Sequence, residues 1–81
     1  YGVIFKRKIL NELELQYLDS VPLIKQAAFL AKRFAAKEAI SKAFGTGIGS
    51  FLQFRDITIL NDKLGKPMVE INNHNKFPDL N

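Results

Sequence analysis

An acidic and a basic side chain, Glu38 and Lys42, stand four residues apart in the middle of the chain. Glu38 is the only acidic residue between Asp19 and Asp56. On a helix this spacing puts both side chains on one face, where the carboxylate could ligate Mg²⁺ and the ammonium could hold a phosphate. The same spacing is typical of an exposed Glu–Lys pair worth about 0.3–0.5 kcal/mol. One carboxylate is also only part of a Mg²⁺ site, which takes its other ligands from further carboxylates, water or substrate phosphates.

Three glycines follow this pair, at Gly45, Gly47 and Gly49. Loops that hold phosphate usually lead into the amino end of a helix, where the helix dipole is positive. These glycines instead follow the predicted carboxyl end of a helix, where the dipole is negative. A phosphate bound here would therefore need Lys42 or a metal ion to offset the dipole, and a simple helix cap followed by a connector is the alternative.

Lys66, beside Pro67 in a predicted turn, is a further candidate for phosphate contact, although a solvated turn lysine is commoner. His74 is the only histidine and lies in an asparagine-rich stretch, where an ordinary surface residue is expected. One histidine on its own defines no Ser-His-Asp arrangement.

A short helix is predicted over residues 12–19. Asn11 can cap it, and Glu14 three residues later completes a capping-box pattern. Leu13, Tyr17 and Leu18 are expected to face inward.

A long helix is predicted from Leu23 to Phe44, because this stretch has no proline or glycine and is rich in strong helix formers. Pro22 fits its start and Gly45 its end. A stripe with a spacing of three and four residues predicts its face: Ala27, Leu30, Ala31, Phe34, Glu38 and Lys42.

Two strands are predicted after the glycines, over Phe54–Leu60 and Met68–Ile71. Turn residues between them indicate a hairpin, and Pro67 fits the first position of the second strand. Residues 72–81 are predicted to form a loop. The order helix, helix, strand, strand indicates an α+β fold.

The length of 81 residues allows one domain, taken as residues 1–81. The absence of cysteine excludes a disulfide scaffold, a thiolate zinc site and a cysteine nucleophile. No apolar run approaches the roughly 20 residues of a membrane span. The net charge of +4 arises mainly from residues 1–10 and 21–50. Such a field suits nucleic acid, an acidic protein or a phosphorylated small molecule, and equally a solvated helix face.

Residues 29–49, with the sequence FLAKRFAAKEAISKAFGTGIG, closely resemble the bacterial holo-acyl-carrier-protein synthases, which are small 4′-phosphopantetheinyl transferases. The resemblance continues through Phe54–Ile57 and Leu64–Pro67, and upstream through Phe5–Leu10 and Asn11–Glu14. It covers nearly all of residues 5–71. It implies the α+β fold of that family, with a long central helix packed on a small antiparallel sheet.

The resemblance also implies an activity. Members transfer 4′-phosphopantetheine from coenzyme A to a serine of apo-acyl carrier protein, and release adenosine 3′,5′-bisphosphate. The family uses Mg²⁺ and forms trimers with active sites at subunit interfaces. The implied setting is fatty acid biosynthesis in the cytoplasm, with no nucleic-acid partner and no membrane association.

Site residues are implied by position in the family pattern. Glu38 matches the metal-binding glutamate, and Lys42 matches the lysine at the coenzyme A phosphates, which is also a candidate for assisting deprotonation of the serine. Coenzyme A contacts are further implied for Gly45, Lys66 and Pro67. Arg7 and Lys8 fall in the basic region that would face the acidic carrier protein.

The sequence departs from the family at both ends. The family begins with a strand that bears a metal-binding aspartate and finishes with a further strand, and neither matches a segment of this sequence. Both are therefore expected to be missing, and residues 1–81 alone are expected to be inactive and poorly folded. Two alternatives remain open: a small basic nucleic-acid-binding domain, and a non-catalytic relative that binds carrier protein or coenzyme A.

Overall fold

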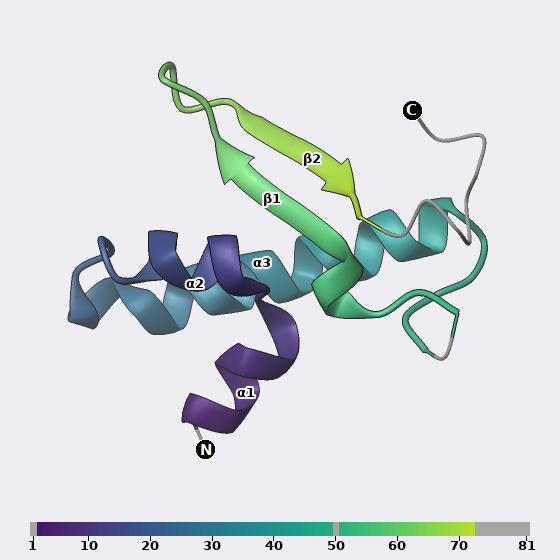
Figure 1. The fold of residues 1–81 in the computed structure, drawn as a ribbon, viewed down its shortest axis with the longest axis horizontal. Coiled ribbons are helices and arrows are strands. Elements are labelled where there is room, and N and C mark those ends of the chain that lie inside the picture. Colours follow the sequence, from purple (N-terminus) through teal and green to yellow (C-terminus); the bar gives the residue numbers. More distant parts are fainter. Residues whose placement is uncertain (1, 50, 73–81) are drawn as a thin grey trace.

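A long helix organises the computed structural model, which describes residues 2–49 and 51–72 (Figure 1). Two shorter helices pack beside it, and the first strand of a two-stranded hairpin crosses it next to the second of them (Figure 1). The elements are α1 (Gly2–Ile9), α2 (Glu12–Leu18), α3 (Leu23–Ala43), the 3₁₀ turn η1 (Phe54–Asp56), β1 (Ile57–Asn61) and β2 (Pro67–Ile71). This arrangement confirms the predicted α+β class. None of the helices in the described part of the chain combines the length and apolar character needed to cross a membrane.

Helix α1 was not predicted, because its short sequence carries no capping signal and its last turn is a run of basic residues. Ile9 at its end and Leu10 just beyond it are fully buried. They form one core cluster with Leu18 of α2, against which Phe29 and Phe34 of α3 pack. Burial of this apolar end holds α1 against the long helix.

Helix α2 begins as predicted, with both bonds of the capping box present. The Glu14 backbone N–H donates to Asn11 Oδ1 at 3.2 Å, and the Asn11 N–H donates to Glu14 Oε1 at 3.0 Å. The predicted inward face is right at Leu18, which is buried, and wrong at Leu13 and Tyr17, which are 57% and 37% exposed. Glu14 is buried in their place, so α2 is turned by about one residue from the predicted setting.

Helix α3 ends within one residue of the prediction. The Gly45 N–H donates to the Lys42 carbonyl at 2.9 Å and the Thr46 N–H to the Ser41 carbonyl at 3.4 Å. This is the Schellman arrangement, with glycine in the left-handed position at φ 79°. Gly45, the first of the three glycines, therefore forms a helix cap, which is the alternative that the sequence left open.

Replacing Gly45 by alanine is expected to destabilise the protein by about 1 kcal/mol, because a side chain strains the left-handed conformation. An added Cβ would meet no atom within 4 Å, so the cost comes from the backbone alone. Gly49 is the matched control, since it has equal space and no positive φ. Urea unfolding of both variants measures the difference. Equal stability of the two would contradict this explanation.

The first predicted strand begins three residues late. Phe54–Asp56 form η1, because the Asp56 carboxylate accepts a hydrogen bond from the Gln53 N–H at 2.9 Å and closes a turn. β1 then pairs antiparallel with β2, from Ile57 opposite Ile71 to Asn61 opposite Pro67. Pro67 opens β2, as predicted. Residues 73–81 of the predicted loop lie outside the described residues.

A second core cluster joins the hairpin to the carboxyl half of α3. Leu52, Ile57 and Ile59 are buried in it, and Ala36 and Ile40 of α3 pack against them. β2 is exposed at its first four positions. Ile71, at the last position of β2, packs against the same cluster, so both strands contribute to it.

Candidate active site

Glu38 and Lys42 lie one turn apart near the end of α3, with Glu38 half-buried and Lys42 exposed. The described residues form two ion pairs, and neither includes Glu38 or Lys42. The predicted alternative of a surface Glu–Lys pair is therefore not formed. In the described part of the chain both charges remain available to a ligand.

The packed face of α3 is not the predicted stripe. Its fully buried residues are Lys37 and Ser41, whereas Lys42 is exposed. Leu30, Phe34, Lys37 and Ser41 also follow a spacing of three and four, but a lysine and a serine are unusual core residues. The Ser41 hydroxyl donates to the Glu38 carbonyl at 2.7 Å. Glu38 therefore stands at the edge of the packed face instead of within it.

Lys37 forms a buried ion pair with Glu14 that the sequence interpretation missed. The two side chains are 0% and 1% exposed, and Lys37 Nζ lies 2.6 Å from Glu14 Oε1. Lys37 Nζ also donates to the carbonyls of Ile9 at 2.7 Å and Phe54 at 3.0 Å. Burial lowers the pKa of the Lys37 ammonium, and the hydrogen bond and charge of Glu14 oppose that shift.

Both oxygens of the Glu14 carboxylate accept hydrogen bonds. Besides Lys37, the carboxylate accepts the Asn11 N–H and, at 2.9 Å, the Ile59 N–H of β1. The capping box and the spacing of Lys37 on α3 were the only signals for this pair in the sequence.

Lys66 and Pro67 lie apart from Glu38 within the chain. Lys66 is exposed in the hairpin turn, where its N–H donates to Asp62 Oδ1 at 2.9 Å. That turn projects away from the carboxyl end of α3 (Figure 1). The structure therefore brings Glu38, Lys42 and Gly45 together along α3 and its cap, and leaves Lys66 and Pro67 separate.

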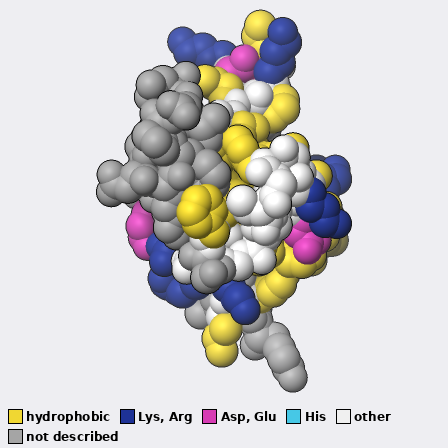
Figure 2. Space-filling view, turned by 90° about the vertical axis from the view of Figure 1, so that its right-hand side faces the viewer, with side chains coloured by type: hydrophobic (Ala, Val, Ile, Leu, Met, Phe, Trp, Pro, Cys, Tyr) yellow, Lys and Arg dark blue, Asp and Glu magenta, His cyan; other side chains and the backbone are white. Residues whose placement is uncertain are grey.

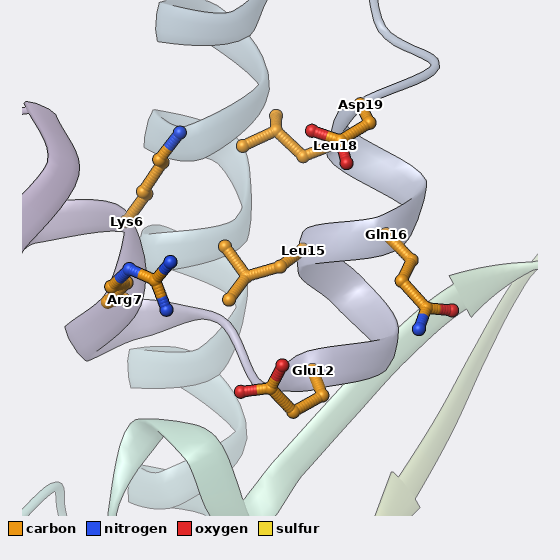
Figure 3. Close-up of a pocket in the computed structure, with 7 residues that line it drawn as sticks. All are labelled: Lys6, Arg7, Glu12, Leu15, Gln16, Leu18 and Asp19. Carbon is orange, nitrogen blue, oxygen red and sulfur yellow. The ribbon is translucent and has the colours of Figure 1, made fainter.

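An open pocket of about 230 Å³ lies between α1 and α2. Lys6 and Arg7 reach into it from α1 and face Leu15 of α2 (Figure 3). Its remaining lining is Glu12, Gln16, Leu18 and Asp19. Of the two basic residues predicted to face a partner, Arg7 lines this pocket and Lys8 is exposed outside it.

The positive charge does not form one patch on the side of the molecule at the end of α3. There the Lys and Arg side chains lie in several separate groups around the rim (Figure 2). This face is therefore not a continuous polyanion-binding surface over its visible part.

The donor set can be compared with the requirements of Mg²⁺. Across residues 2–49 and 51–72, no three acidic or histidine side chains gather around one point. Glu38 offers a single carboxylate, which is a hard oxygen ligand of the kind that Mg²⁺ prefers. Mg²⁺ commonly takes one or two carboxylates and completes its shell with phosphates and water, so Glu38 fits as one ligand of such a site.

Comparison with known proteins places this geometry in a family. The family model of the 4′-phosphopantetheinyl transferase superfamily matches residues 4–81. The chain belongs to this superfamily. A holo-[acyl-carrier-protein] synthase of Orientia tsutsugamushi (strain Ikeda) is 49% identical over 77 residues, which are 95% of this chain and 59% of that protein.

Solved structures of superfamily members share the fold. A holo-(acyl-carrier-protein) synthase of Bacillus anthracis str. Ames, in complex with CoA (3′,5′-ADP), matches with a TM-score of 0.79 and 44% identity, over 84% of this chain and 59% of that one. The holo-[acyl-carrier-protein] synthase of Neisseria meningitidis matches with a TM-score of 0.78 and 45% identity, over 88% and 55%. The predicted transferase-like fold is thus confirmed. This superfamily chain spans somewhat more than half the length of these relatives.

Proposed function

We propose that this protein transfers 4′-phosphopantetheine from coenzyme A to a serine of apo-acyl carrier protein, releasing adenosine 3′,5′-bisphosphate. The observation that carries the proposal is the placement of Glu38 and Lys42. Both lie on one turn of α3, outside its fully buried row and unpaired among the described residues, in a chain of the transferase superfamily. The named relatives support the same reaction.

Glu38 would hold Mg²⁺ through its carboxylate. When bound, the ion would offset negative charge on the phosphates and on the departing adenosine 3′,5′-bisphosphate. The half-buried position of Glu38 would strengthen the attraction between its carboxylate and a bound ion, because the effective dielectric constant is lower there than in bulk water.

Lys42 would hold the coenzyme A phosphates. Its ammonium stands in the last turn of α3, where the helix dipole is negative, so it can offset the repulsion between that end and an anion. In the transfer, the serine oxygen bonds to the phosphorus of the phosphopantetheine group, the bond from that phosphorus to the oxygen kept by the nucleotide breaks, and the serine proton passes to a base or to solvent. Lys42 is also the candidate to assist that proton loss.

We further propose a homotrimer in which coenzyme A contacts residues of two subunits. The separation of Lys66 and Pro67 from Glu38 within one chain supports this, because both groups are assigned to the same ligand (Figure 1). Met68 and Val69 are exposed on opposite faces of β2, so this strand offers apolar side chains to a neighbouring subunit. Gly45, in the cap beside Lys42, would contact coenzyme A. We place the reaction in fatty acid biosynthesis in the cytoplasm.

Arg7 and Lys8 would attract the acidic carrier protein, and the pocket between α1 and α2 would take part of its surface. Reversing both charges, Arg7→Glu with Lys8→Glu, is expected to raise the carrier KM about tenfold or more and to leave kcat unchanged. The salt dependence of kcat/KM should also weaken. Lys32→Glu is the control, because Lys32 is exposed and lies about opposite the packed row of α3. An equal rise in KM for both variants would refute the docking assignment.

The test of the function uses the full-length protein, coenzyme A, Mg²⁺ and an apo-acyl carrier protein. The intact mass of the carrier is expected to increase by one phosphopantetheine group. No increase with any of several carriers would reject the transferase function. Binding of carrier or coenzyme A without transfer would instead favour a non-catalytic relative.

A further inference from the structure

The buried Lys37–Glu14 pair connects all the described helices and strands except β2. Lys37 Nζ uses all three of its N–H groups, on Glu14, on the end of α1 and on η1. Glu14 in turn binds the start of α2 and the Ile59 N–H of β1. Two side chains thus tie α1, α2, η1 and β1 to one position on α3.

That position immediately precedes Glu38. Successive residues of a helix are rotated by about 100°, so fixing the direction of Lys37 also fixes the directions of Glu38 and Lys42. Ser41, one turn beyond Lys37, is buried on the same row, and its hydroxyl bonds to the Glu38 carbonyl. The rotation of α3 about its axis, which buries Lys37 and Ser41, therefore decides where the Glu38 carboxylate lies.

Apolar contacts alone would set this rotation weakly. Hydrophobic burial has no preferred direction, whereas the bonds of Lys37 have defined donors, acceptors and lengths. A small rotation of α3 would strain all three bonds at once, at an ammonium group that is fully buried. A buried ion pair is also a poor means of gaining stability compared with well-packed apolar side chains, which leaves orientation as its use here.

We propose that Lys37 and Glu14 are positioning residues, which set the rotation of α3 and so place Glu38 for metal binding. This inference rests on the proposed function only in taking Glu38 as a metal ligand. It requires neither transfer nor a carrier protein.

The test compares Mn²⁺ binding by the full-length wild type and three variants, measured by electron paramagnetic resonance at a fixed coenzyme A concentration. The first variant, Glu14→Gln with Lys37→Met, removes both charges with little change in volume and leaves no unpaired buried ion. The second, Glu14→Gln alone, keeps Lys37 and an amide oxygen that can still accept its hydrogen bond, so it removes the charge of Glu14 but not every bond of the pair. The control, Glu12→Gln with Arg55→Met, removes the exposed pair between α2 and η1, whose side chains are 77% and 48% exposed.

The Mn²⁺ dissociation constant of a folded Glu14 variant is expected to rise at least fivefold, and that of the control to stay within twofold of the wild type. A crystal structure of the double variant without metal should show α3 rotated relative to β1. A folded Glu14 variant that binds Mn²⁺ like the wild type overturns the inference, and so does a wild type without Mn²⁺ affinity. A wild type that binds Mn²⁺ but modifies no carrier rejects the proposed function, while the comparison of affinities still decides the positioning role.

Discussion

Glu38→Gln is expected to lower kcat/KM for phosphopantetheine transfer by about a hundredfold or more. A bound metal ion contributes several kcal/mol to the stabilisation of charge in phosphoryl transfer, and each 1.4 kcal/mol corresponds to about tenfold in rate. Glutamine keeps the size of the side chain and removes its charge. The carboxylate makes no ion pair among the described residues, so the free energy of unfolding should change by about 0.5 kcal/mol or less.

Transfer is measured from the carrier mass as a function of time, and stability from urea unfolding of the same samples. Lys32→Gln is the matched control, because it removes one exposed charge from the same helix, away from Glu38. Glu38→Asp retains a carboxylate and should keep more activity than Glu38→Gln, with a higher Mg²⁺ requirement. Transfer by Glu38→Gln at the wild-type rate would overturn the metal-site assignment while leaving the transferase function in place.

Removing one partner of the buried pair is expected to have the largest effect on stability. Lys37→Ala or Glu14→Ala should each lower the free energy of unfolding by about 3–5 kcal/mol, because the remaining ion is left buried without its partner. A small domain has only about 5–15 kcal/mol in total, so these variants would be largely unfolded at moderate urea concentrations.

Arg55→Ala provides the comparison for this loss. It breaks the exposed pair with Glu12, whose atoms are 3.3 Å apart, and should cost about 1 kcal/mol or less. Urea unfolding of the full-length proteins gives all three values. If Lys37→Ala were as mild as Arg55→Ala, the pair would not be the connection between α3 and the other elements that its hydrogen bonds indicate.

Much of the local structure follows from the sequence. Asn11 and Glu14 start α2, and Gly45 ends α3, because a cap needs only a few adjacent residues of the right type. The hairpin also follows from adjacent residues, with turn residues between its strands and Pro67 at the start of the second strand. The α+β class then follows from the order of these elements.

The errors occur where adjacent residues do not decide the outcome. The conformation of α1 depends on burial of Ile9 and Leu10 against other helices, and not on its own weak signals. The start of β1 depends on an Asp56 carboxylate that closes a turn first. The inward face of α2 depends on Glu14 finding a cation on α3, 23 residues away.

The candidate site divides in the same way. Residue types and spacing on α3 single out Glu38 and Lys42, because a helix keeps residues four apart on one side whatever surrounds it. The sequence does not decide which face of α3 is buried. The stripe through Glu38 and the stripe through Lys37 have the same spacing, and Leu30 and Phe34 fit both. Only the tertiary structure selects the row of Lys37 and Ser41, because Glu14 and the Ile9 and Phe54 carbonyls meet at Lys37. That choice leaves Glu38 half-buried and Lys42 exposed at the end of the helix.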